Sequence, residues 1–185
     1  MNSKLILAAA GLFAGLGAAA PASAATTSAT IKASILKPVQ LTGGGTLDLG
    51  TILTPSAATF SGTFTVAAAA SQTGTFCAAG FSCTGSPAAA MFNIQGTNKT
   101  NIGLNIPLSI VLTLQNYTGG GTVPTMSIST LNSIAANNTT GSYTMQVPNS
   151  GTPGLDFYVG GVLTVTQATV GGNYAGTITV TADYN

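Results

Sequence analysis

The sequence of 185 residues contains no histidine, glutamate, arginine or tryptophan. Only 4% of its residues are charged, against about a quarter in an average globular protein. Enzymes need a general acid or base, an activated nucleophile or a metal, and three dispersed aspartates without histidine supply none of these. A chain without a basic patch also has nothing to displace the counterions of nucleic acid. We therefore expect no catalytic residue, no metal or cofactor site and no nucleic-acid partner.

The most apolar stretch lies at the N-terminus, where Lys4 precedes a run from Leu5 to Ala20. The run is short for a membrane span, and Ala22-Ser23-Ala24 after it is a small-residue cleavage site. The sequence therefore predicts that residues 1–24 are a signal peptide, removed between Ala24 and Ala25, and that the protein is exported.

The only two cysteines, Cys77 and Cys83, are separated by five residues that include Gly80. An even number of cysteines in an exported protein favours a disulfide, and two free thiols are the alternative. The spacing is too wide for a C-x-x-C redox motif, and no histidine or second cysteine pair is present to complete a zinc site.

After residue 24, helix signals are scarce, and threonine, valine, isoleucine and glycine dominate. Turn-forming clusters recur roughly every ten residues, a spacing typical of a sandwich or a barrel. The expected extended stretches are Thr30–Leu41, Leu47–Ile52, Phe60–Val66, Met91–Gln95, Ile106–Asn116, Thr122–Leu131, Tyr143–Val147, Asp156–Thr166 and Tyr174–Tyr184. We expect residues 39–185 to form an all-β sandwich domain. One face of the stretch 106–116 should carry Ile106, Leu108, Ile110, Leu112 and Leu114.

The last expected strand alternates between apolar and polar residues, a period of two that indicates one dry and one wet face. Exposed edge strands invite pairing with another chain. This strand is therefore a candidate acceptor edge, and an ordinary terminal strand of a closed sheet is the alternative. The candidate acceptor residues are Gly172, Ile178, Val180 and Tyr184.

Residues 25–38 form an N-terminal extension or first strand with the same alternation. Its apolar face carries Ala29, Ile31, Ala33 and Ile35, and these are the candidate residues of a strand donated to another molecule. An ordinary first strand of the domain's own sheet is the alternative.

Three motifs resemble those of the exported bacterial proteins grouped as domain of unknown function 4402. Leu155–Val165 resembles the family's F-x-V-G-G-x-L-x-V signature, and Gly172–Val180 resembles its G-x-Y-x-G-x-(F/I)-x-V ending. Leu47–Ile52 resembles its L-x-F-G-x-I element. The resemblance extends over nearly all of the chain from Thr30 to Asn185.

The same C-terminal stretch resembles subunits of chaperone–usher pili, which carry a penultimate aromatic, here Tyr184, and a glycine before the last strand, here Gly171-Gly172. That resemblance implies an immunoglobulin-like, Greek-key sandwich that lacks its final strand. A periplasmic chaperone would lend a strand first, and the extension of the next subunit would replace it at an outer-membrane usher. The cysteine pair departs from many pilins, in which the disulfide ties the first strand to a later one.

These observations together predict a structural subunit of a bacterial surface fibre. It would pass through the periplasm and polymerise head to tail with copies of itself in an extracellular fimbrium. The alternatives are an adhesin or carbohydrate-binding module, which usually presents exposed aromatics, and a small outer-membrane β-barrel, which needs two aromatic girdles. With no tryptophan, five tyrosines and seven phenylalanines, the chain is poor in both features.

Overall fold

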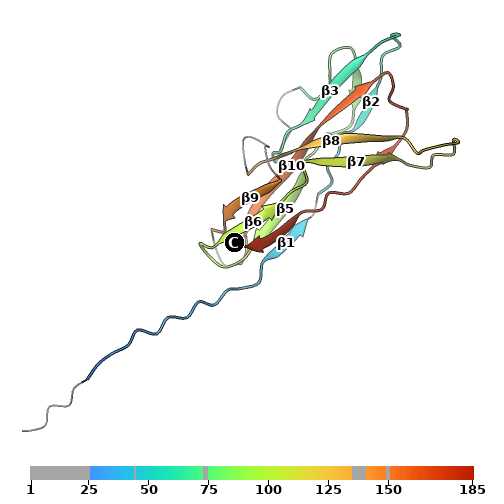
Figure 1. Ribbon diagram of the computed structural model, residues 1–185. Helices are drawn as coiled ribbons and strands as arrows, with labels where there is room; N and C mark the ends of the chain where they lie inside the picture. The colour runs from blue at the N-terminus through green and yellow to red at the C-terminus, as the bar shows by residue number, and fades with distance from the viewer. Residues whose placement is uncertain (1–25, 44, 73–74, 135–140, 149–150) are drawn as a thin grey trace, which may run out of the picture. The chain divides into compact units, whose positions relative to one another are not determined.

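The computed structural model describes residues 26–43, 45–72, 75–134, 141–148 and 151–185. The chain divides into two compact units, Met1–Ser34 and Ile35–Asn185. Residues 26–34, the described part of the first unit, lie outside any strand or helix. All strands belong to the second unit, and the described residues include no helix, so the expected all-β fold is confirmed (Figure 1).

The described residues form twelve strands. They are β1 (Gln40–Gly43), β2 (Thr51–Leu53), β3 (Ser61–Val66), β4 (Ser82–Thr84), β5 (Ala90–Gln95), β6 (Asn101–Asn105), β7 (Ser109–Leu114), β8 (Thr125–Asn132), β9 (Ser142–Gln146), β10 (Leu155–Thr166), β11 (Tyr174–Ala175) and β12 (Thr181–Tyr184).

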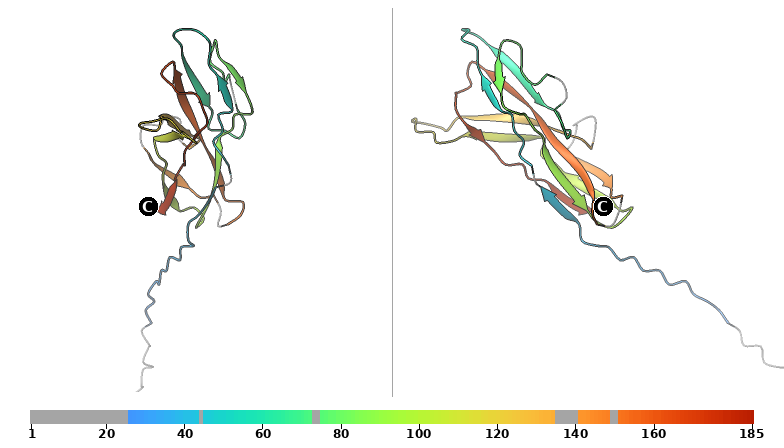
Figure 2. Two further views of the ribbon diagram at one scale, coloured as in Figure 1. Left: turned by 90° about the vertical axis from the view of Figure 1, so that its right-hand side faces the viewer. Right: turned by 180° about the vertical axis from the view of Figure 1, so that it is seen from behind.

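Two antiparallel sheets and a short pair of strands make up the second unit. The large sheet has the order β1-β5-β10-β8-β7-β11, with β3 also paired to β10. The small sheet has the order β12-β6-β9, and β2 pairs with β4. The views in Figure 2 place the small sheet near one end of this unit and β2, β3 and β4 near the other. Neighbours in the large sheet, such as β5 and β10, are distant in sequence, so long stretches of chain connect them.

The longest strand, β10, connects the two ends of the unit. It pairs with β5 through Leu155–Val159 and with β3 through Gly161–Thr166, along the same edge, while β8 lies on its other edge. Gly160 is the residue at which the partner changes. A Cβ atom there would overlap the carbonyl oxygen of Val66 at the end of β3, so only glycine fits.

Apolar side chains form two core clusters. The first lies between β5, β6, β9 and β10 and consists of Ile94, Ile102, Leu104, Ile106, Met145, Val147, Phe157 and Val159. The second lies on β3, β7, β8 and β10 and consists of Phe64, Ile110, Leu112, Ile128, Leu163 and Val165. The alternating burial of β3, β7 and β8 follows the period of two expected from their sequences.

The expected strand Ile106–Asn116 is present but shorter, as β7 at Ser109–Leu114. Pro107 interrupts it, because proline has no N–H to give to a sheet ladder. Asn101–Asn105 before it belongs to the small sheet, and Ser109–Leu114 after it belongs to the large one. The expected alternation holds at Ile106, Ile110, Leu112 and Leu114, which are buried, and fails only at Leu108, which is 47% exposed.

The expected single strand Tyr174–Tyr184 is also interrupted. Its first two residues pair with β7 in the large sheet, and Thr181–Tyr184 pairs with β6 in the small sheet. Gly176 lies at the crossing, and a Cβ atom there would come within 2.6 Å of the carbonyl oxygen of Val111. The expected alternation of this stretch is confirmed. The residues between its half-buried side chains are exposed, and the half-buried ones are Ile178, Val180, Ala182 and Tyr184.

Candidate functional site

The N-terminal arm, defined here as residues 26–36, is not the first strand of the sandwich. The first strand is Gln40–Gly43, and residues 26–38 are exposed and lie outside every described strand. Ile31 is 93% exposed and Ile35 is 87% exposed. The apolar side chains of the candidate donor residues are therefore all exposed to solvent, namely Ala29, Ile31, Ala33 and Ile35.

The residue that follows the arm is held by the domain. The main-chain N–H of Lys37 donates to Thr97 Oγ1 at 2.7 Å, and the hydroxyl of Tyr184 donates to the carbonyl oxygen of Lys37. The same hydroxyl accepts a hydrogen bond from the Thr97 N–H at 2.7 Å. Tyr184 therefore ties the end of β12 to the start of the domain.

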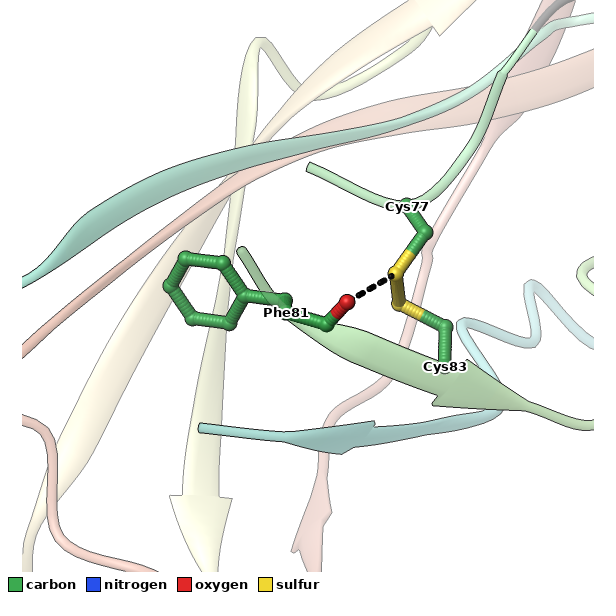
Figure 3. The surroundings of a disulfide bond; sticks show 3 residues. All are labelled: Cys77, Phe81 and Cys83. Atoms are coloured by element: carbon green, nitrogen blue, oxygen red, sulfur yellow. Dashed lines mark hydrogen bonds between the residues drawn. A yellow bond between two sulfur atoms is a disulfide. The ribbon is translucent and has the colours of Figure 1, made fainter. Parts of the chain in front are cut away.

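Cys77 and Cys83 form a disulfide, as the sequence predicted. Gly80 lies between them at φ +83°, in a turn that Phe81 N–H closes on Ala78 O at 3.1 Å. Figure 3 shows Phe81 beside the disulfide, with its carbonyl oxygen 3.5 Å from Cys77 Sγ. That approach is a contact only, because a disulfide sulfur carries no hydrogen.

The loop closed by the disulfide and the residue just before it present aromatic rings to the second core cluster. The ring of Phe81 meets that of Phe64 edge to face, with centroids 5.1 Å apart, and Phe76 contacts the same Phe64 at 5.7 Å. Such aromatic pairs stabilise a fold beyond the area that they bury. The position of the bridge indicates a role in holding this loop on the core.

A cleft of about 730 Å³ opens beside the second core cluster. One wall is formed by residues 45–52 with Thr54, and the other by residues 169–178. Its base is formed by apolar side chains of β7, β8 and β10, namely Ile110, Leu112, Met126, Ile128, Leu163 and Val165. Asp48 is the only charged residue that lines the cleft.

The first wall of the cleft contains an isolated β-bridge outside the named strands, and its other edge is open. Asp48 exchanges two main-chain hydrogen bonds with Ala88, at 2.8 and 3.0 Å. Peptide groups of successive strand residues point in opposite directions, so those of Leu47 and Leu49 point away from Ala88. Within the described residues, neither leucine makes a main-chain hydrogen bond.

The second wall is open in the same way. Asn173 O accepts from Gln115 N–H at 2.8 Å, and Ala175 lies opposite Thr113 of β7. The chain then runs from Gly176 to Val180 without a main-chain hydrogen bond to any other part that the structure describes. The β11 strand is accordingly the outer strand of the large sheet.

The candidate acceptor residues are divided between two places. Gly172 and Ile178 line the cleft. Val180 and Tyr184 do not line it and pack instead against the first core cluster. Ala24 and Ala25, the predicted cleavage site, lie outside the described residues.

Sequence reasoning missed the wall that contains Leu47 and Leu49. The alternation Leu47-Asp48-Leu49 is visible in the sequence, but nothing in it shows that this segment has a partner on one side only.

In the part of the chain that the structure describes, three or more potential metal ligands do not come together, and no helix is long and apolar enough to cross a membrane.

Comparison with protein-family models gives a match over most of the chain. The family described as Domain of unknown function (DUF4402) matches residues 39–184, which include both walls of the cleft. No match to a curated protein was found.

Proposed function

The chain belongs to the family described as Domain of unknown function (DUF4402), and from that premise we propose that it is a structural subunit of an exported surface fibre. Each copy donates its N-terminal arm as a strand to the next copy. The family's description assigns no activity, so the proposal depends on features of this chain.

The observation that carries the proposal is the exposed, alternating apolar face of the arm. Burying an isoleucine side chain is worth about 1.5–3 kcal/mol relative to leaving it in water. Ile31 and Ile35 are 93% and 87% exposed in the isolated chain, so nearly all of that stabilisation is still available for binding. A strand that binds another copy would also satisfy its main-chain groups by β-augmentation.

A contact of this kind builds a fibre because it is heterologous. The donor segment and its acceptor are different surfaces, and head-to-tail contacts that do not close produce open filaments. Charge supports the same conclusion. Removal of residues 1–24 also removes Lys4 and leaves three lysines and three aspartates, whose charges sum to zero. A net charge near zero favours association.

An exported subunit with an unfilled acceptor would need protection before assembly. We include in the proposal a periplasmic chaperone that occupies the acceptor and an outer-membrane usher at which the arm of the next subunit replaces it. We propose both partners because the C-terminal stretch resembles that of pilus subunits.

The test removes residues 26–36 and keeps the predicted cleavage site. The truncated chain should be secreted and fold, and it should remain monomeric in size-exclusion chromatography at concentrations where the intact chain forms fibres in electron micrographs. A control that replaces Thr26, Thr27 and Ser28 by alanine keeps the apolar face and should still assemble. Fibres formed by the truncated chain, or an intact chain that stays monomeric at high concentration, would refute the proposal.

A further inference from the structure

We infer that the cleft is the acceptor for the arm, and that its occupant is residues 29–35 of a second copy. The inference rests on the fibre function proposed above and locates the binding site on the receiving copy. It places that site in the cleft and not at the outer edge of β12, the strand that contains the candidate Tyr184.

The main chain supplies the first argument. An extended strand in the cleft would lie between the open edge at Leu47 and Leu49 and the open edge at Gly176–Ile178. Its own N–H and C=O groups alternate in direction, so it could pair with both walls as an interior strand does. The β12 strand is the outer strand of the small sheet and offers pairing on one side only.

The side chains supply the second argument. Leu47, Leu49, Met126 and Ile178 are half-buried and pack against the second core cluster, so the cleft still exposes apolar surface. On an extended strand, alternate residues face the same side at intervals of about 7 Å. Ile31, Ala33 and Ile35 would therefore face the base of the cleft together, with the small alanine between the two large side chains.

Charge favours one register. Lys32 is the only charged residue of the occupant, and Asp48 is the only charged residue of the lining. Asp48 is exposed while Leu47 and Leu49 on either side of it are half-buried, so its carboxylate lies on the outward face of the wall. A strand that turns Ile31 and Ala33 inward turns Lys32 outward as well. The two charges can then pair across neighbouring strands.

The outer edge of β12 lacks an equivalent space. Ala182 and Tyr184 already pack against the first core cluster, and the Tyr184 hydroxyl is engaged with Thr97 and Lys37. A strand added there would gain main-chain hydrogen bonds on one side only, and no residue of β12 lines the cleft that could receive its isoleucines.

The test is site-specific photo-crosslinking of the full mature chain. Ile31 is replaced by an aliphatic amino acid that carries a diazirine, and this chain is mixed with a ¹⁵N-labelled chain without the probe before assembly. After irradiation, the crosslinked peptides are mapped by mass spectrometry. We expect adducts on ¹⁵N-labelled peptides that contain residues 45–54 or 169–178.

The other outcomes separate the two proposals. Fibres with adducts on β12 or β1, or on the probe's own copy, overturn the cleft as the acceptor for a second copy and leave the fibre function standing. An absence of polymer in the unmodified mixed sample overturns the fibre function and this inference together.

A matched pair of substitutions gives a second measurement. Met126→Gln places a polar group in the cleft, and Met91→Gln makes the same change on β5 at a side chain that is 39% exposed and does not line the cleft. We expect Met126→Gln to raise the concentration needed for assembly about tenfold and Met91→Gln to leave it unchanged. Equal thermal unfolding of the two monomers shows that folding is not the cause, and equal assembly of the two variants would refute the cleft as acceptor.

Discussion

The double substitution of Ile31 and Ile35 by alanine separates assembly from folding. Each change removes three carbon groups, worth about 0.8 kcal/mol apiece when buried, or about 2.4 kcal/mol per isoleucine. If both side chains become buried on donation, the pair contributes about 5 kcal/mol. A tenfold change in affinity is about 1.4 kcal/mol, so the affinity between copies should fall by roughly three to four orders of magnitude.

The isolated subunit should not be affected by the same substitutions. Both isoleucines are about nine-tenths exposed before assembly, so their truncation removes almost no buried contact from the fold. Light scattering against concentration measures assembly, and calorimetry of the monomer measures the unfolding temperature. The matched control is Thr30→Ala with Ser34→Ala on the wet face of the arm. A double isoleucine variant that assembles like the parent, or that unfolds several degrees earlier, would show that the arm does not act by donation.

Three further predictions concern export, the disulfide and the final strand. The intact mass of secreted protein should correspond to a chain that begins at Ala25, and a retained Met1 would contradict export. Cys77 and Cys83 should resist alkylation without reductant, and replacing both by alanine should lower the free energy of unfolding by about 2 kcal/mol, as expected for so short a loop; labelling of either thiol in freshly secreted protein would contradict the bridge. Val180→Asp should destabilise the domain by roughly 2–4 kcal/mol and reduce secreted protein, because Val180 packs on the first core cluster. The neighbouring exposed substitution Thr179→Asp should have little effect, and equal yields of the two variants would show that this face is not buried.

Strand positions were predictable where one side of the strand faces the core. The interval Asp156–Thr166 was expected as a strand, and β10 covers Leu155–Thr166. Phe64 and Val66, expected on one strand, are both fully buried in β3. These successes have one cause: an alternation of two requires only local sequence and a dry side.

Changes of sheet were not predictable from the same pattern. Residues on both sides of Pro107 alternate, and so do residues on both sides of Gly176, although the chain crosses between the sheets at each place. Alternation reports that a strand has a dry face, but it does not report which sheet contributes the neighbouring strand. The proline and the glycine were the only local signs of a break.

The cleft could not be predicted because its walls are remote in sequence. Residues 45–54 and 169–178 come together only through the order of strands in the large sheet. The arm could be proposed as a donor because all of its relevant residues are consecutive. Its proposed acceptor depends on three-dimensional arrangement, and of the four candidate acceptor residues only Gly172 and Ile178 line the cleft.

Gly160 and Gly161, the two glycines of the V-G-G motif, have a structural role in β10. Gly160 and Gly161 are required where β10 exchanges one neighbour for another, because side chains there would overlap Val66 on one strand and Ile128 on another. The motif therefore reflects the fold and does not by itself indicate a function. We expect family members that share the proposed fibre function to have two other features. One is an alternating apolar segment before the domain, and the other is a leucine–aspartate–leucine segment that is paired on one side only.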